Sequence, residues 1–92
     1  MNVRYASTAL AEIDDILSYI AKDNPLAAHE VSVMLRTAID RLAQFPHLAI
    51  ETDVAGVRMA PVLPYRYLIF YALEDDAVII RNVRHAARNR SW

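Results

Sequence analysis

The chain has 92 residues, no cysteine and a net charge of −1 at pH 7. This length suits one domain, and the lack of cysteine excludes a disulfide framework and a thiolate nucleophile. No stretch approaches the ~18 apolar residues of a membrane span, and the first residues lack the apolar core of a secretory signal. We therefore expect a single soluble domain over residues 1–92, located in the cytoplasm.

A short strand and a first helix are predicted at the start of the chain. Residues 2–5 favour a strand, and Ser7 and Thr8 then offer hydroxyl groups that can cap a helix. From Leu10 onward, apolar residues recur at spacings of three and four, which is typical of one face of a helix. This pattern ends near Asp23.

A second helix is predicted directly after the first. Asn24 suits the N-cap of this helix, and Pro25 suits its first position. Apolar residues recur every three or four positions as far as Phe45. Pro46 ends the helix because proline disfavours helical geometry at the residue before it. Since the link between the helices is so short, they must form an antiparallel hairpin.

The rest of the chain predicts a sheet. Residues 47–56 show no period and are expected to form a loop, whereas residues 57–63, 67–73 and 77–84 read as three strands. Short connections join these strands, so they should form an antiparallel meander. The expected fold is α+β: an N-terminal strand, an antiparallel helical hairpin packed on an antiparallel β-sheet, and a short C-terminal tail.

The middle strand is apolar on both of its faces. Tyr67, Ile69 and Tyr71 alternate with Leu68 and Phe70, so neither face carries the polar side chains of a solvated sheet. Two helices cover only one face. The other face should expose apolar area for a partner, unless the chain ends fold over it.

Arginines are concentrated in the second half of the chain. Residues 1–56 carry four basic and eight acidic side chains, whereas residues 57–92 carry six arginines and three acidic residues. The planar guanidinium suits carboxylate and phosphate groups. This distribution predicts contact with a macromolecule, with a solvated tail as the plain alternative. Duplex DNA is a less suitable partner, because the sequence has neither a DNA-binding motif nor a high overall charge.

Five stretches spread over the whole chain share their order with one group of proteins. They are Asn24-Pro25-x-Ala27-Ala28 at the bend of the hairpin, Phe45-Pro46, Val57-Arg58, residues 64–71 and residues 79–88. In this order they resemble the RelE/ParE superfamily of bacterial toxins.

The resemblance implies a compact toxin of a type II toxin–antitoxin module, with roles in growth inhibition and plasmid stabilization. Such a toxin is neutralised by a small antitoxin whose C-terminal segment wraps its surface, and the pair can assemble into larger complexes. RelE-like members enter the ribosomal A site and cleave mRNA. ParE-like members poison DNA gyrase and are not nucleases.

A metal-free nuclease needs a base for the 2′-hydroxyl, a cation for the phosphorane charge and an acid for the leaving oxygen. Glu51 and His85 are the candidate bases, and His85 also suits the acid because imidazole titrates near neutral pH. The candidate cations are Arg58, Arg66, Arg84 and Arg88. If the chain is RelE-like, the implied catalytic set is Glu51, Arg66, His85 and Arg88.

Two departures from the RelE-like pattern favour a ParE-like toxin. RelE-like proteins have an arginine directly before the aliphatic-aliphatic-tyrosine of the middle strand. This chain has Leu68 there, with Arg66 two residues earlier, about 7 Å along a strand. Ala86 and Ala87 interrupt the basic cluster, and the ending Arg-His-Ala-Ala-Arg resembles the ParE-like form. We therefore expect a gyrase inhibitor without catalytic residues. A RelE-like endoribonuclease and a non-toxic binding module are the alternatives.

Contacts with two partners are predicted by residue type. The residues expected to bind the target are Arg58, Arg84, His85, Arg88, Arg90 and Trp92. Those expected to bind the antitoxin are Arg66, Tyr67, Tyr71 and Arg81. His85 also suits a structural hydrogen bond, and the tyrosines also suit the core.

Two further expectations concern ion pairs and metals. Arg81 and Arg84 are expected on alternate faces of the last strand, so that at least one pairs with an acid such as Asp14 or Asp15. The three histidines lie far apart in sequence, without the ligand spacing of a zinc site, so no metal is expected. No cofactor is expected either.

Overall fold

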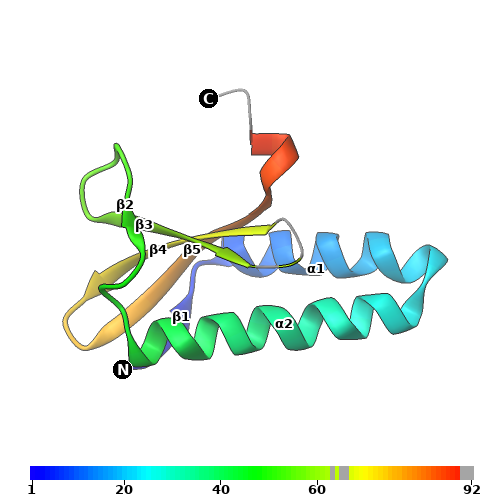
Figure 1. Ribbon diagram of the computed structural model, residues 1–92, viewed down its shortest axis with the longest axis horizontal. Coiled ribbons are helices and arrows are strands. Elements are labelled where there is room, and N and C mark those ends of the chain that lie inside the picture. Colours follow the sequence, from blue (N-terminus) through cyan, green and yellow to red (C-terminus); the bar gives the residue numbers. More distant parts are fainter. Residues whose placement is uncertain (63, 65–66, 90–92) are drawn as a thin grey trace.

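A layer of two helices lies on one face of a five-stranded sheet (Figure 1). The computed structural model describes residues 1–62, 64 and 67–89. Its elements, in chain order, are β1 Asn2–Tyr5, α1 Ser7–Asp23, α2 Pro25–Gln44, β2 Ile50–Glu51, β3 Val57–Val62, β4 Tyr67–Glu74, β5 Ala77–His85 and the 3₁₀ helix η1 Ala86–Asn89. Both predicted helices and all four predicted strands are present.

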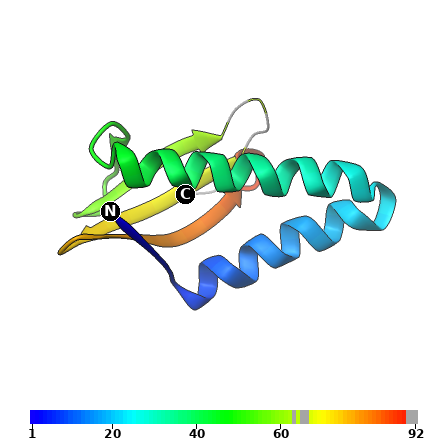
Figure 2. The same cartoon turned by 90° about the horizontal axis from the view of Figure 1, so that it is seen from below.

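The two helices form an antiparallel hairpin, as the short link between them predicts. The Asn24 side chain accepts a hydrogen bond from the backbone N–H of Ala27 at 3.0 Å, and Pro25 occupies the first position of α2. The predicted cap of α2 is confirmed. Figure 2 shows the helices side by side, with their bend projecting beyond the sheet. In the part of the chain that the structure describes, neither helix has the length and apolarity needed to span a bilayer.

The beginning of α1 differs from the prediction. Ala6 is its N-cap, without a side-chain hydrogen bond, and Ser7 and Thr8 lie inside the first turn. The cause lies in the sheet, because the Ala6 N–H donates to the Ile80 carbonyl oxygen at 2.9 Å. The chain therefore leaves the sheet and enters the helix at the same residue.

The strands are ordered β1-β5-β4-β3-β2 across the sheet. β3, β4 and β5 form the predicted antiparallel meander. β1 pairs in parallel with the first half of β5, so the sheet is mixed and not wholly antiparallel. β2 lies within the predicted loop and pairs with β3 at Arg58 and Met59. With two residues, it is too short to show a strand period in the sequence.

A β-bulge interrupts the pairing of β4 with β5. Phe70 lies opposite Asn82, but the next residue of β4, Tyr71, lies opposite Ile80. Arg81 is therefore an extra residue of β5 at this point. Such an insertion shifts the alternation of side chains along the bulged strand by one position.

The bulge places two arginines on the same face of β5. Ile80 and Val83 are both buried although they are three residues apart, with at most 1% of their surface exposed. Arg81 and Arg84 adjoin these inward residues, so both lie on the face away from the helices, and both are exposed. The prediction that these arginines alternate between faces is wrong, because it assumed a regular strand.

The core lies between α2 and the central strands. Its fully buried members are Ala9, Val31, Leu35, Ile39, Leu42, Val62, Ile69, Tyr71, Val78, Ile80 and Val83. Of these, α1 contributes only Ala9, and the other apolar residues of α1 are partly buried at its margin. α2 therefore supplies most of the buried helix side chains, while α1 packs on β5 through partly buried ones.

Truncation of Leu35 should destabilise the fold. Leu35 is 3% exposed, and Leu35→Ala should lower the free energy of unfolding by about 2–5 kcal/mol because it leaves a cavity under the sheet. Urea unfolding followed by circular dichroism measures the change. Val33→Ala, on the same helix but 49% exposed, should change it by less than about 0.5 kcal/mol. Equal losses in the two variants would contradict this account of the core.

Candidate functional site

The face of the sheet opposite the helices, which we call the open face, combines apolar and arginine side chains. Its described members include Arg4 of β1, Ile79, Arg81, Asn82 and Arg84 of β5, Leu68, Phe70, Ala72 and Glu74 of β4, and Met59 and Pro61 of β3. Figure 1 shows η1 and the connection between β2 and β3 rising on this side of the sheet, at its two ends. The open face is therefore a floor between two raised segments.

Cross-strand pairing fixes the positions of the open-face residues relative to one another. Phe70 lies between Met59 of β3 and the bulge at Arg81, while Leu68 lies opposite Arg84. The apolar residues at its centre are half-buried, and both arginines are exposed. The result is an apolar strip with guanidinium groups along its β5 side.

Glu12 of α1 reaches the free edge of β5. β1 ends opposite Ile80, so it does not pair with the second half of β5. There, Glu12 Oε1 accepts hydrogen bonds from the Val83 N–H at 3.0 Å and from Asn82 Nδ2 at 3.1 Å. One carboxylate thus takes over from β1 as the partner of this strand edge.

The same carboxylate holds Arg84. Glu12 Oε2 lies 3.3 Å from Arg84 Nε, in an ion pair whose side chains are 25% and 48% exposed, respectively. The prediction that Arg81 or Arg84 pairs with an acid is confirmed for Arg84. The acid in this ion pair is Glu12, which also bonds to the uncovered edge of β5 at Val83.

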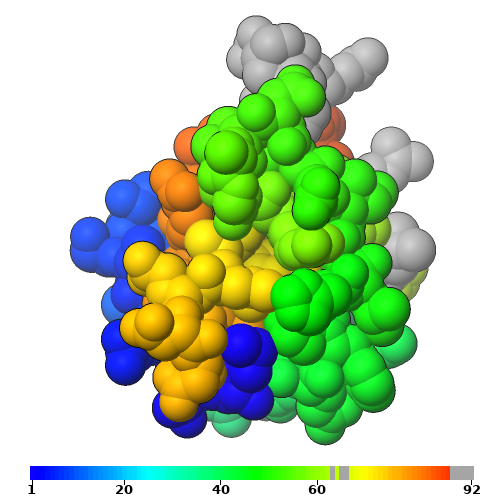
Figure 3. All heavy atoms as spheres, turned by 90° about the vertical axis from the view of Figure 1, so that its left-hand side faces the viewer, coloured from blue at the N-terminus to red at the C-terminus, as the bar shows by residue number. Residues whose placement is uncertain are grey.

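Arg58 holds the segment that follows α2. Its Nη1 donates to the carbonyl oxygens of Ala49 at 2.8 Å and His47 at 3.3 Å, and its Nη2 lies 3.1 Å from Glu51 Oε1. Figure 3 shows this segment, in green, standing against the yellow end of β4. Arg58 was predicted to bind the target, but the structure directs its guanidinium to the chain itself, and its side chain is 20% exposed.

Tyr71 also fastens the segment after α2 to the sheet. Its hydroxyl donates to the Pro46 carbonyl oxygen at 2.7 Å, and the residue is 0% exposed. Burial raises the pKa of the Tyr71 phenol, against the opposing effects of the Arg58 charge and a backbone hydrogen bond with Ala49. Tyr71 was expected to contact an antitoxin, but in this structure its side chain is buried and offers no surface to a partner.

His85 and Tyr67 pack together at the other end of the sheet. Their rings meet edge to face with centroids 5.4 Å apart, and His85 Nδ1 accepts a hydrogen bond from the Ala87 N–H at 3.2 Å. His85 therefore orients the start of η1. This is the structural role that the sequence left open for it.

The candidate base and acid of a nuclease are far apart. Glu51 in β2 and His85 in β5 are separated by three strand spacings of about 4.8 Å, and by four residues along the strand direction. Their backbones are therefore roughly 19 Å apart. Of the other predicted site residues, Arg66, Arg90, Trp92 and the side chain of Arg88 lie outside the described part of the chain. In the described ranges, no group of three histidines or acids could hold a metal ion.

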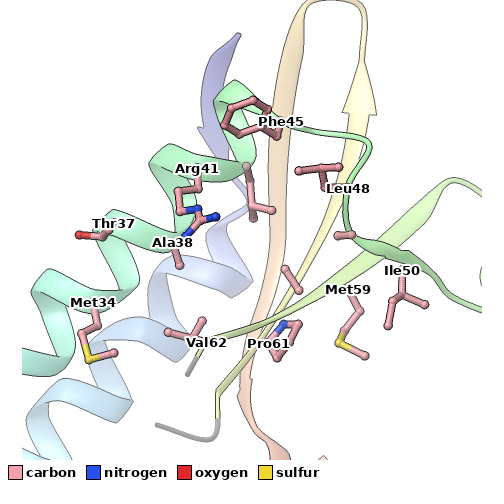
Figure 4. Close-up of a pocket in the computed structure, with 13 residues that line it drawn as sticks. Met34, Thr37, Ala38, Arg41, Phe45, Leu48, Ile50, Met59, Pro61 and Val62 are labelled. Atoms are coloured by element: carbon pink, nitrogen blue, oxygen red, sulfur yellow. The ribbon is translucent and has the colours of Figure 1, made fainter. Parts of the chain in front are cut away.

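A groove of about 560 Å³ runs between α2 and β3, with part of the segment after α2 as its third wall (Figure 4). Its rim carries exposed apolar side chains, with Phe45, Leu48 and Ile50 exposed by 51%, 78% and 64%. Arg41 lies on its α2 wall. Beyond β2, residues 60–62 of β3 have no strand on their outer side among the described residues. The sequence analysis missed this groove, and its signal was the run of apolar side chains in a predicted loop.

Comparisons with known proteins agree with this fold. The family model for the ParE toxin of the type II toxin–antitoxin system parDE matches residues 3–90. The chain belongs to this family. The resemblance to the RelE/ParE superfamily, expected from the sequence, is thereby confirmed.

Among the proteins similar to this chain are a curated relative named as a RelE toxin and a structural neighbour from a ParDE system. Toxin RelE2 of Caulobacter vibrioides is 40% identical over 80 residues, covering 87% of this chain and 89% of the relative. A chain of the chromosomal ParDE toxin–antitoxin system of P. aeruginosa has the same fold, with a TM-score of 0.82 at 15% identity, covering 92% of this chain and 95% of that one. The E. coli DinJ–YafQ complex contains a chain with a TM-score of 0.55 at 14% identity, covering 98% of both.

Loss of the Glu12 carboxylate should weaken the attachment of α1 to the sheet. Glu12→Ala removes the carboxylate that accepts three hydrogen bonds from β5 and should lower the free energy of unfolding by about 1–3 kcal/mol. Asp15→Ala, an exposed change on the same helix, is the matched control and should stay within about 0.5 kcal/mol. Thermal and urea unfolding of both variants measure the difference, and an unaltered Glu12→Ala protein would refute the role of this carboxylate.

Proposed function

We propose that this chain is a ParE-like toxin that stops growth by binding DNA gyrase in the cytoplasm and does not cleave RNA. The main support for this proposal is the distance between the backbones of Glu51 and His85. Cleavage through the 2′-hydroxyl needs a base and an acid that each come within about 3 Å of atoms of one phosphodiester. Groups whose backbones are roughly 19 Å apart do not meet this requirement.

The structural roles of these groups also argue against catalysis. Glu51 is paired with Arg58, and His85 Nδ1 accepts a backbone hydrogen bond. Both residues therefore stabilise connections at the ends of the sheet. The exposed Arg4 and Arg81 of the open face can serve binding, which is what a gyrase inhibitor requires.

Expression of the chain alone distinguishes the two activities. We expect growth arrest with gyrase-dependent DNA breaks and intact transcripts, and inhibition of gyrase supercoiling by the purified protein. His85→Asn, which keeps an acceptor for the Ala87 N–H, and Glu51→Ala should each retain inhibition within about threefold, because surface changes outside a contact are nearly neutral. Cleavage of mRNA on ribosomes by the wild-type chain, lost in His85→Asn, would overturn the proposal.

A RelE-like ribosome-dependent endoribonuclease is the second candidate. The name of the Caulobacter relative, Toxin RelE2, favours it. In that case, an alternative position of the residues around the open face would have to bring a base and an acid together. The same expression experiment decides between the candidates.

We further propose that an antitoxin neutralises the chain by filling the groove between α2 and β3. The groove offers apolar side chains to bury, Arg41 to pair with a carboxylate, and, at the edge of β3 beyond β2, Pro61, whose carbonyl oxygen can accept a hydrogen bond but which has no N–H to donate. An apolar segment with an acidic side chain matches all three features.

Groove variants test the antitoxin contact. Leu48→Asp should weaken antitoxin binding by about tenfold or more, because it puts a charge on the apolar rim. Leu26→Asp is the matched control, since Leu26 is 67% exposed at the hairpin bend and Leu48 is 78% exposed at the groove. Calorimetry with a cognate antitoxin measures both affinities. Equal affinities would exclude the groove as the contact.

A further inference from the structure

We infer that the toxin contacts its target through the open face, centred on Arg81, and that the target offers an acidic protein segment with apolar side chains. This inference rests on the proposed function, because it names the surface with which a binding toxin engages gyrase. It moves Arg81 from the antitoxin contacts expected from the sequence to the target contacts.

The β-bulge is the first observation behind this inference. A regular β5 with Ile80 facing the helices would turn Arg84 toward the core, because the two residues are an even number of positions apart. The extra residue keeps Ile80 and Val83 in the core and turns both Arg81 and Arg84 outward. β-Bulges commonly re-aim side chains beside functional sites.

The charge of the open face selects an acidic partner. Arg4 of β1 lies opposite Ile79 and is exposed, so it extends the row formed by Arg81 and Arg84. Glu12 holds Arg84 at its Nε and so fixes the direction of that side chain. A negative charge, Glu74, also lies on this face, at the end of β4 beside the β4–β5 turn. A carboxylate of the target would pair with Arg81.

The apolar strip beside the arginines favours a protein over a nucleic acid. Ile79, Ala72 and Met59 are half-buried and present aliphatic surface, which a protein segment can cover with its own apolar side chains. Non-specific nucleic-acid binding is driven by neutralising several phosphates. Among the described residues, three arginines lie on this face, and one of them is paired with Glu12. On a chain of net charge −1, these arginines can neutralise few phosphates.

Charge reversal at Arg81 tests the surface. Arg81→Glu should raise the concentration of toxin that half-inhibits gyrase supercoiling by about tenfold or more, and Arg81→Lys should lie between it and the wild type. Arg36→Glu is the matched control, because Arg36 is exposed on α2, in the other layer, and the same charge change there should shift inhibition by less than about twofold. Unfolding curves of all three variants should match the wild type.

A second measurement does not depend on enzyme inhibition. Association of the wild-type chain with immobilised gyrase should slow as salt rises, and Arg81→Glu should reduce this dependence, because steering by opposite charges is screened by ions. Arg36→Glu should leave the salt dependence unchanged. A salt dependence equal in all variants would overturn the inference.

The outcomes separate the inference from the proposed function. If the wild-type chain does not inhibit gyrase, the proposed function fails. If it inhibits gyrase and Arg81→Glu inhibits equally well, only the open-face inference fails. Fluorescence anisotropy with a labelled 20-base DNA and RNA provides the last check: binding of either probe that Arg81→Glu abolishes would overturn the choice of a protein partner.

Discussion

The attachment of β5 to the elements on either side of it determines most features of this molecule. This strand pairs with β4 along one edge and with β1 along part of the other, and Glu12 then takes the place of β1. The bulge at Arg81 lets the strand keep its apolar side chains in the core on both sides of the irregularity. The exposed arginines are a by-product of that packing requirement, so charge and core are set by one local distortion.

The helical hairpin and the meander could be predicted from the sequence because both produce long, regular patterns. Asn24 and Pro25 mark the start of α2 chemically, and apolar spacing marks the length of each helix. The bulge escaped prediction because a single extra residue leaves no pattern of its own. β2 escaped for a similar reason, and the position of Ala6 at the start of α1 depends on a hydrogen bond to a strand that is distant in sequence.

The candidate site could be predicted only in part, because residue type does not reveal which groups serve the fold. Arg58 and Tyr71 have the side chains of a functional site, yet both fasten the segment after α2 to the sheet. Arg84 was correctly expected to find an acid, but the identity of that acid depends on where β1 ends. The groove beside α2 combines three separate stretches of sequence, none of which indicates a cavity alone.

The parallel pairing of β1 with β5 has a consequence for the timing of toxicity. Chains are synthesised from the N-terminus, so the backbone groups of β1 cannot form their hydrogen bonds until β5 has been made. The open face includes Arg4 of β1 and Arg81 of β5, so it cannot form on a chain that lacks β5. Contacts between segments so distant in sequence also slow folding. If the target binds the open face as proposed above, a nascent chain has no complete contact surface until translation has passed β5.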